Sequence, residues 1–276
     1  MGKCKYCGES AGWFSYRHTA CEDAFTQAQA DFTRTLAEPL TAESAANLKA
    51  IAAAGRLSDD WVRPTALTGL RTALDRLLDD GLLSEAEQEQ LDGFREAMGF
   101  DIESADIQGY RHKLFRAQSL RMLLEGEDPS VHFAYEGMLP VLLMKSEKLL
   151  YLFKGVEFWE ERTRTTYEGR SSGVSLRIAK GVYYRTGGFR GNPVKETGLE
   201  HIDTGIFVVT DTHVYFHGPS KSFRTRYSKM VGVDPYEDGV GIRKDGTTAR
   251  PQVFSGLDGW YVYNVIRHFA PSRGLG

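Results

Sequence analysis

All three cysteines of this 276-residue chain, Cys4, Cys7 and Cys21, lie near its amino terminus, and His18 stands between the last two. Two short pairs of this form, Cys-x2-Cys and His-x2-Cys separated by a loop, usually encode a tetrahedral zinc site, because thiolate sulfur and imidazole nitrogen are preferred zinc ligands. Gly8, directly after the first pair, permits the tight turn that such a site needs. The sequence therefore predicts a Zn2+ site with these three cysteines and His18 as its ligands.

The segment that carries these residues resembles a treble-clef or zinc-ribbon-like finger. The expected order is the Cys-x2-Cys turn, a short hairpin through "ESAGWFSYR" and a helix that starts near Thr19. A finger of this size, residues 1–25, cannot bury a hydrophobic core, so metal ligation would supply its folding free energy. Because four protein ligands leave no position open for water or substrate, the predicted zinc is structural.

Three other interpretations of the thiols compete with the metal site. A disulfide with one free thiol is disfavoured by the odd number of cysteines in a chain expected in the cytoplasm. A redox Cys-x-x-Cys pair would normally follow a strand in a βαβ unit, and no such unit is expected here. Gly2 and Cys4 mimic a doubly acylated amino terminus, although Tyr6 occupies a position where the myristoylation pattern has Ser or Thr. We therefore favour the metal site.

Composition and charge limit the class of protein. With 41% apolar and 26% charged residues the chain is typical of a globular protein, and its length predicts two units. Residues 1–129 contain 14 basic and 22 acidic residues, whereas residues 130–276 contain 20 basic and 15 acidic residues. This asymmetry argues against uniform nucleic-acid binding and leaves an anionic partner for the second half. The longest apolar runs, such as Met138–Met144, are too short to span a bilayer and no signal peptide precedes them, so we expect a cytoplasmic protein.

The middle of the chain, residues 26–128, is predicted to be helical, since Ala, Leu, Glu, Gln and Arg dominate and β-branched residues are sparse. Leucines recur at helical spacing behind Pro64, which suits the first turn of a helix. Ser84-x-x-Glu87 has the form of a capping box that begins the next helix. A last helix is expected to end at Glu125, with Ile107, Tyr110, Leu114, Ala117 and Leu124 facing inward.

Residues 129–276 change to aromatic and β-branched residues in short runs separated by glycine, which is typical of an all-β domain. In "KSFRTRYS" the alternation predicts one face with Phe223, Thr225 and Tyr227 and an opposite face with two arginines. The run "VSLRIA" alternates in the same way, with Arg177 opposite Val174, Leu176 and Ile178. A terminal helix is expected to bury a stripe of Trp260, Tyr261, Val265 and Phe269.

The run from Gly205 to Gly246 resembles the bacterial pleckstrin-homology-like and GRAM-like barrels. The resemblance lies in "TDTHVYF", which begins at Thr210, and in "YSKM", which begins at Tyr227, and it extends over about residues 145–270. It implies a scaffold that binds proteins, peptides or lipid headgroups. The predicted fold class is therefore α+β: an N-terminal zinc finger, a helical middle segment and an antiparallel pleckstrin-homology-like β-barrel capped by a C-terminal helix.

One detail of the barrel favours phosphate-bearing headgroups. Lys154 followed by Arg162 and Arg164 resembles the strand-pair pattern by which some pleckstrin-homology domains hold inositol phosphates, and arginine suits bidentate phosphate contacts. Three glutamates share that strand, so a solvated face of mixed charge is the competing interpretation. Arg224 and Arg226 complete the candidate partner-binding set.

The sequence shows no motif that predicts catalysis. A Walker loop, a nucleophile elbow and a zinc-protease motif are all missing, and His213 and His217, on one face of a predicted strand, have no evident third metal ligand. We predict a non-enzymatic protein whose barrel docks a protein partner, the favoured class, or an anionic lipid headgroup. The alternative is a nucleic-acid binder that uses the finger and a basic face of Arg162, Arg164, Arg177, Arg224 and Arg226. A third hypothesis is an enzyme whose site is assembled only in three dimensions.

Overall fold

The structure is a computed structural model that describes residues 2–100, 108–133, 135, 137–166, 175–179, 182–185, 194–246 and 249–270. Within these ranges the side chains at 108, 164–166, 175–179, 182–185 and 194–196 are not described. The chain divides into two compact units, Met1–Arg121 and Met122–Gly276. None of the described helices is both long and apolar enough to cross a bilayer.

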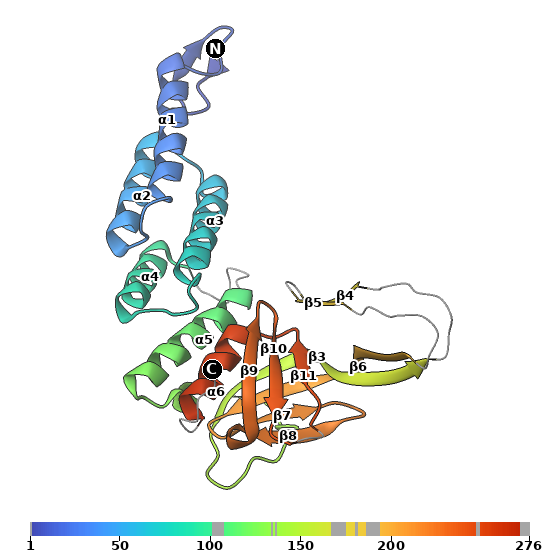
Figure 1. The fold of residues 1–276 in the computed structure, drawn as a ribbon. Helices are drawn as coiled ribbons and strands as arrows, with labels where there is room; N and C mark the ends of the chain where they lie inside the picture. The colour runs from blue at the N-terminus through green and yellow to red at the C-terminus, as the bar shows by residue number, and fades with distance from the viewer. Residues whose placement is uncertain are drawn as a thin grey trace. The chain divides into compact units, whose positions relative to one another are not determined.

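The first unit contains a small hairpin and a set of helices (Figure 1). The hairpin consists of β1 (Gly2–Lys3) and β2 (Ser10–Gly12). The helices are α1 (Thr19–Thr35), α2 (Ala42–Gly55), α3 (Asp59–Leu77), α4 (Glu85–Met98) and α5 (Gln108–Glu125), the last of which runs across the boundary between the units.

The helices bury one apolar face each in a shared core, which includes Phe32, Leu48, Leu70 and Phe94. The capping box of α4 forms as predicted: the Ser84 hydroxyl accepts the backbone N–H of Glu87, whose carboxylate accepts the backbone N–H of Ser84.

Two expectations for the helices are wrong. Pro64 does not lie in a first turn, because α3 begins earlier, at Asp59, and the proline falls in its second turn. Leu124 is exposed rather than inward-facing, since the buried face of α5 near its end is formed by Leu120 and Leu123 instead. Ile107 lies outside the described residues.

The second unit is built on a seven-stranded antiparallel sheet in the order β8-β7-β6-β3-β11-β10-β9. A separate two-stranded sheet pairs β4 with β5. The strands are β3 (Leu149–Thr166), β4 (Ser175–Ala179), β5 (Val182–Arg185), β6 (Val194–Thr210), β7 (His213–His217), β8 (Ser222–Arg226), β9 (Met230–Tyr236), β10 (Gly239–Lys244) and β11 (Gln252–Ser255). The predicted α+β class is confirmed. The closure expected of a barrel is not, because β8 and β9 stand at the two edges of the sheet.

The sheet is nevertheless strongly curved. Phe216 of β7 and Phe223 of β8 contact Phe254 of β11, three or four places away in the strand order, at ring-centroid distances of 5.9 and 6.3 Å. The ammonium of Lys244 in β10 lies 5.5 Å from the ring of Phe223. An aromatic core therefore fills the concave side of the sheet.

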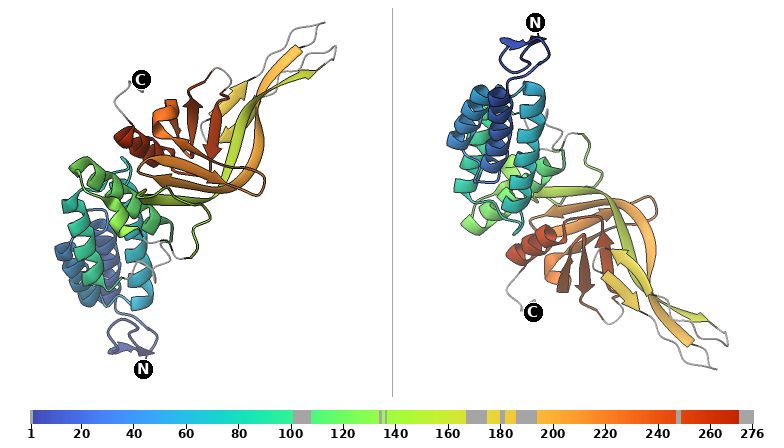
Figure 2. Two further views of the ribbon diagram at one scale, coloured as in Figure 1. Left: turned by 90° about the horizontal axis from the view of Figure 1, so that it is seen from below. Right: turned by 90° about the horizontal axis from the view of Figure 1, so that it is seen from above.

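The last helix, α6 (Gly259–Phe269), packs against β9 and β10 (Figure 2). Its Tyr261 ring contacts the rings of Tyr151 and Phe153 in β3. Its buried face is Tyr261, Val262, Val265 and Ile266. The stripe predicted for this helix is thus partly wrong, because Trp260 points outward and remains about half exposed.

The composition of "LLYLFK" and of "VEFWEERTRTTY" predicts two strands on either side of Gly155, but residues 149–166 form the single strand β3, which pairs with β6 along almost its whole length (Figure 1). A register shift occurs at Gly155, whose φ of +71° lies in the left-handed region that favours glycine. The alternation predicted in β8 is confirmed, since Thr225 is buried and Arg224 and Arg226 are exposed. The side chains of the "VSLRIA" run are outside the described set.

Candidate metal centre and docking face

The structure brings together the four predicted metal ligands. One donor atom from each of Cys4, Cys7, His18 and Cys21 lies within 4.8 Å of the others. The Nδ1 atom of His18 is 3.4 Å from the Cys7 sulfur and 3.7 Å from the Cys21 sulfur. All three cysteines are free thiols. This donor set could hold one metal ion.

Local backbone structure positions these donors. The Cys4–Cys7 turn is closed by hydrogen bonds from the Gly8 N–H to the Cys4 carbonyl and from the Cys4 N–H to the Glu9 carbonyl, at 2.8 and 2.7 Å. Gly8 adopts a φ of +76°, which a residue with a Cβ rarely tolerates. Cys21 lies in the first turn of α1, three residues after His18, so the helix start directs both toward the turn.

A second contact orients the histidine. The Nε2 atom of His18 lies 3.1 Å from the carbonyl oxygen of Ser10, in β2. A proton on Nε2 makes this contact a hydrogen bond and leaves the Nδ1 lone pair facing the thiols. Metal-ligating histidines characteristically have such a backbone or carboxylate acceptor behind them.

The pKa values of Cys4 and Cys21 are shifted in opposite directions. Burial acts to raise the pKa of Cys4, but hydrogen bonds from the backbone N–H groups of Cys7, Tyr6 and His18 together lower it to about 6. Burial, with the neighbouring Cys7 and Cys4, raises the pKa of Cys21 to about 11. A bound cation would favour the deprotonated, ligating form of Cys21.

In the second unit, the segment 133–144 packs along the convex face of the sheet; two of its residues, 134 and 136, are not described. Its odd-numbered side chains contact a buried row formed by Leu152 of β3, Val208 of β6 and Tyr215 of β7. The contacting residues are Phe133, Tyr135, Leu139, Val141 and Leu143.

Three other side chains of this segment, those of Met138, Leu142 and Met144, face solvent. Met138 and Leu142 are 92% and 91% exposed, and Met144 is about half exposed. Basic side chains stand beside them: the Arg224 guanidinium donates to the Met144 sulfur at 2.9 Å, and the Lys154 ammonium lies 5.7 Å from the ring centroid of Tyr135. We call Met138, Leu142 and Met144, with Lys154, Arg224 and Arg226, the docking face.

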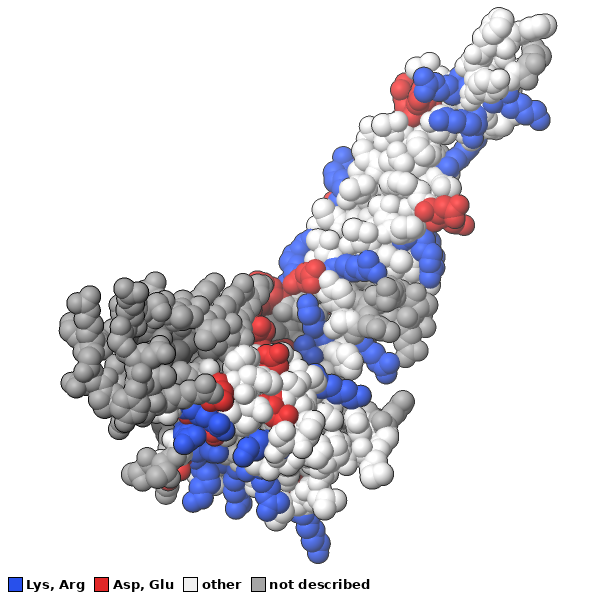
Figure 3. Space-filling view, turned by 90° about the vertical axis from the view of Figure 1, so that its right-hand side faces the viewer, with Lys and Arg blue, Asp and Glu red and all other residues white. Residues whose placement is uncertain are grey.

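The docking face carries uncompensated positive charge. Strands β7 and β8 contain no acidic residue, and among the described residues no carboxylate forms an ion pair with Lys154, Arg224 or Arg226. Figure 3 shows Lys and Arg side chains gathered over the lowest part of the second unit in that view. An anionic partner would meet little repulsion there.

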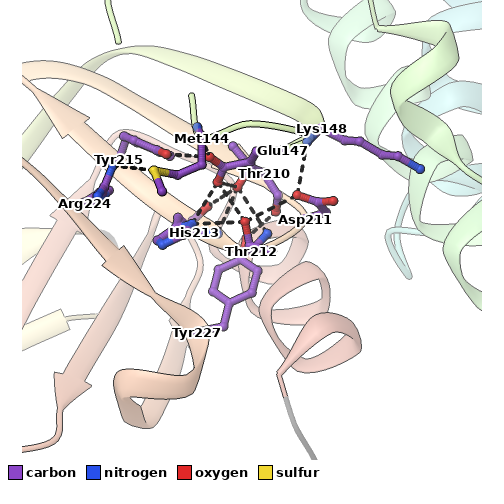
Figure 4. Close-up of polar contacts among 10 residues, drawn as sticks. All are labelled: Met144, Glu147, Lys148, Thr210, Asp211, Thr212, His213, Tyr215, Arg224 and Tyr227. Carbon is purple, nitrogen blue, oxygen red and sulfur yellow. Dashed lines mark hydrogen bonds and ion pairs between the residues drawn. The ribbon is translucent and has the colours of Figure 1, made fainter. Parts of the chain in front are cut away.

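Glu147 ties the end of the segment to the turn between β6 and β7 (Figure 4). Its carboxylate accepts the backbone N–H of Met144 at 2.8 Å, and its side chain is only 1% exposed. The remaining donors to this carboxylate are Thr210, Thr212, His213 and Tyr215. Lys148 and Asp211 add a reciprocal pair of bonds to the same turn. These contacts fix the position of Met144, the last residue of the segment.

The Glu147 network predicts an acid-sensitive stability for the second unit. Burial acts to raise the pKa of Glu147, but the hydroxyl and backbone donors lower it from 4.5 to about 2. Because the folded-state pKa is depressed, the stabilisation is complete above pH 4.5 and is lost as the pH falls toward 2, a loss of about 3 kcal/mol. Urea unfolding of the second unit at several pH values between 5 and 2.5 measures it. A Glu147→Gln protein should lack this component, and an unchanged acid dependence in that variant would contradict the assignment.

The partner-binding residues predicted from the sequence separate into two groups. Lys154, Arg224 and Arg226 lie on the docking face. Arg162 lies further along β3, within 4.0 Å of the carboxylates of Glu160 and Glu200, and the side chain of Arg164 is not described. The basic face predicted for nucleic acid also includes Arg177, whose side chain lies outside the description like that of Arg164, so this face stays a prediction.

The two histidines of β7 have different hydrogen-bond partners. His213 bonds to Glu147 through Nδ1 at 2.9 Å, and His217 Nδ1 lies 2.8 Å from the Ser222 hydroxyl. Among the described residues, no third ligand joins them to form a metal site.

Sequence reasoning missed Glu147 and the exposed side of the 133–144 segment. The run "MLPVLLM" is too short for a bilayer, and the signal that could identify its exposed side is the alternation of residues in an extended run, which face opposite sides. No family model matches the chain, and no curated protein matches it. The two sites are therefore interpreted from their geometry.

Proposed function

We propose that the protein is a non-enzymatic, zinc-stabilised binding module whose second unit docks on an anionic membrane surface. The metal of the finger is Zn2+, because a closed set of three thiolates and one imidazole matches structural zinc sites in ligand type and number. Its role is to fold the finger, since four protein donors leave no coordination position for a substrate.

The observation that carries the membrane proposal is the docking face. Met138 and Leu142 are almost fully exposed although Leu139 and Val141 between them are packed on the sheet, so the segment holds two apolar side chains outward at no benefit to folding. Arg224 contacts Met144 of the same segment, and Arg226 is exposed two residues further along β8. Peripheral membrane binding has two components: apolar side chains enter the acyl region, and neighbouring cations contact the lipid phosphates.

The likeness to pleckstrin-homology-like scaffolds supports this choice. The strongly curved sheet with α6 against it is compatible with such a scaffold, and the resemblance implies ligand binding rather than catalysis. An anionic protein could also contact Arg224 and Arg226. Met138 and Leu142, however, protrude rather than line a groove that a peptide could fill.

Vesicle sedimentation tests the proposal. Wild-type protein is expected to bind vesicles of phosphatidylcholine with about 30% phosphatidylglycerol, and to bind less as NaCl rises from about 0.1 to about 0.5 M. Met138→Asp with Leu142→Asp should weaken binding by about tenfold or more, because two apolar side chains no longer enter the bilayer. Arg224→Glu should weaken binding to the anionic vesicles and leave the small residual binding to neutral vesicles unchanged.

Two controls match these variants. Val231→Asp places a charge at another exposed apolar position of the same unit, and Arg250→Glu reverses a cation that pairs with Glu160. Both should bind within about twofold of wild type. A wild-type protein that fails to sediment with the anionic vesicles overturns the proposal, as does equal loss of binding in the controls and in the docking-face variants.

A further inference from the structure

Three aromatic side chains stand exposed on the loop between β2 and α1, in the finger. Phe14 is 98% exposed, Trp13 79% and Tyr16 74%. No described aromatic ring stacks on any of them. Large aromatic side chains gain most from burial, so three at one loop mark a surface that is covered in use.

The loop that carries them is held from both ends. The Tyr16 carbonyl accepts the backbone N–H of Lys5 at 2.9 Å, and His18, a metal-site residue, reaches back to the Ser10 carbonyl. The backbone of Ser15 passes so close to Gly2 that a Cβ there would lie 2.4 Å from the Ser15 carbonyl oxygen. The metal site and these bonds fix the loop backbone while its aromatic side chains remain free for a partner.

The charge around the loop selects the partner. No acidic residue occurs between Glu9 and Glu22, whereas Lys3 lies in β1, Lys5 lies in the connection from β1 to β2, and Arg17 follows the aromatics. Arg17 is neutralised by an ion pair with Glu22. Figure 3 shows the far end of the finger formed by uncharged residues, with Lys and Arg side chains behind it.

We propose that Trp13, Phe14 and Tyr16 insert into the interfacial region of an anionic bilayer, as a second membrane contact in addition to the docking face. Trp and Tyr have an apolar ring and a polar atom, and they concentrate at the headgroup level of membranes, while Phe enters deeper. A single-stranded nucleic acid would need a groove of cations along its backbone, and the cations among residues 2–21 are Lys3, Lys5, whose ammonium lies over the Tyr6 ring, and Arg17, which pairs with Glu22. This inference rests on the proposed membrane function and adds the finger to it.

Quenching by vesicle lipids with brominated acyl chains tests the insertion of Trp13. Vesicles of the stated anionic composition should quench part of the tryptophan fluorescence of the wild type. Trp13→Phe should remove that part and leave the fluorescence of Trp61, Trp159 and Trp260, the other tryptophans of the chain. Trp13→Ser with Phe14→Ser should weaken vesicle binding by about tenfold, whereas Trp13→Phe, which keeps an aromatic ring, should weaken it by less than about threefold.

The outcomes separate this inference from the proposed function. Zinc content equal to wild type in the serine variant shows that the finger still folds. Loss of vesicle binding in the Met138→Asp, Leu142→Asp protein, with normal binding by the finger variants and with quenching in the wild type no larger than in Trp13→Phe, overturns the insertion and leaves the docking face standing. A wild type that binds no vesicles overturns both. Binding of an oligo-dT strand that depends on Trp13 and Phe14 would assign the tip to base stacking and overturn the membrane inference.

Discussion

Replacing Cys4 and Cys7 by serine is expected to abolish metal binding and to unfold the finger. The wild type should contain about one zinc per chain, and the double variant less than about 0.1, because a serine hydroxyl does not replace a thiolate ligand at neutral pH. The finger lacks an apolar core of its own: among the described residues 2–21, Cys4 is the one buried residue. The loss of folding free energy should therefore be on the order of 10 kcal/mol, confined to the finger.

Elemental analysis and amide NMR spectra measure the two parts of this result. Signals of residues 2–21 should collapse toward the positions of an unfolded chain, and those of the second unit should not move. His18→Cys is the conservative variant, since it supplies another soft ligand, and it should keep most of the zinc. His268→Ala, at an exposed histidine near the end of α6, should keep all of it. Freshly purified and reduced wild type without metal, or a double variant that retains full zinc, would contradict the ligand assignment.

The finger was the most predictable part of the chain. The donors of a small metal-stabilised motif usually recur at short spacings, so the clustering of Cys4, Cys7, His18 and Cys21 could be predicted from their positions alone. The capping box of α4 and the alternation of β8 were predictable for the same reason, because each rests on residues close together in sequence. The sequence could not indicate the hydrogen bond between His18 Nε2 and the Ser10 carbonyl, because this contact depends on the fold of the hairpin.

The arrangement of the second unit depends on distant pairings, and the predictions were weaker there. Gly155 allows β3 to continue through a register shift, so two predicted strands are one. Whether the sheet closes depends on the pairing of β8 and β9, which no local pattern specifies. Glu147 could not be identified as buried, because its donors come from residues more than sixty positions away.

Glu147→Gln is expected to lower the free energy of unfolding of the second unit by about 2–4 kcal/mol at neutral pH. The wild-type carboxylate has only acceptors, and each oxygen receives at least two donors. The side-chain amide of glutamine places an N–H2 group, itself a donor, against some of these donors. The hydroxyls can rotate to accept, but the Met144 N–H cannot, so the amide must turn its nitrogen toward His213 and two threonines. The midpoint of thermal unfolding should fall by about 5–10 °C.

Glu127→Gln is the matched control, since it makes the same change at an exposed carboxylate of the same unit, and it should alter stability by less than about 0.5 kcal/mol. The pH dependence distinguishes loss of charge from mere disturbance of packing. As the pH falls from 4.5 toward 2, protonation of Glu147 removes the same charge in the wild type, so the difference in unfolding free energy between wild type and Glu147→Gln should shrink. A difference that stays constant across this range would show that packing, and not the buried carboxylate, carries the effect. Because Met144 is held by Glu147 and contacts Arg224, the variant should also weaken vesicle binding without altering any exposed residue of the docking face.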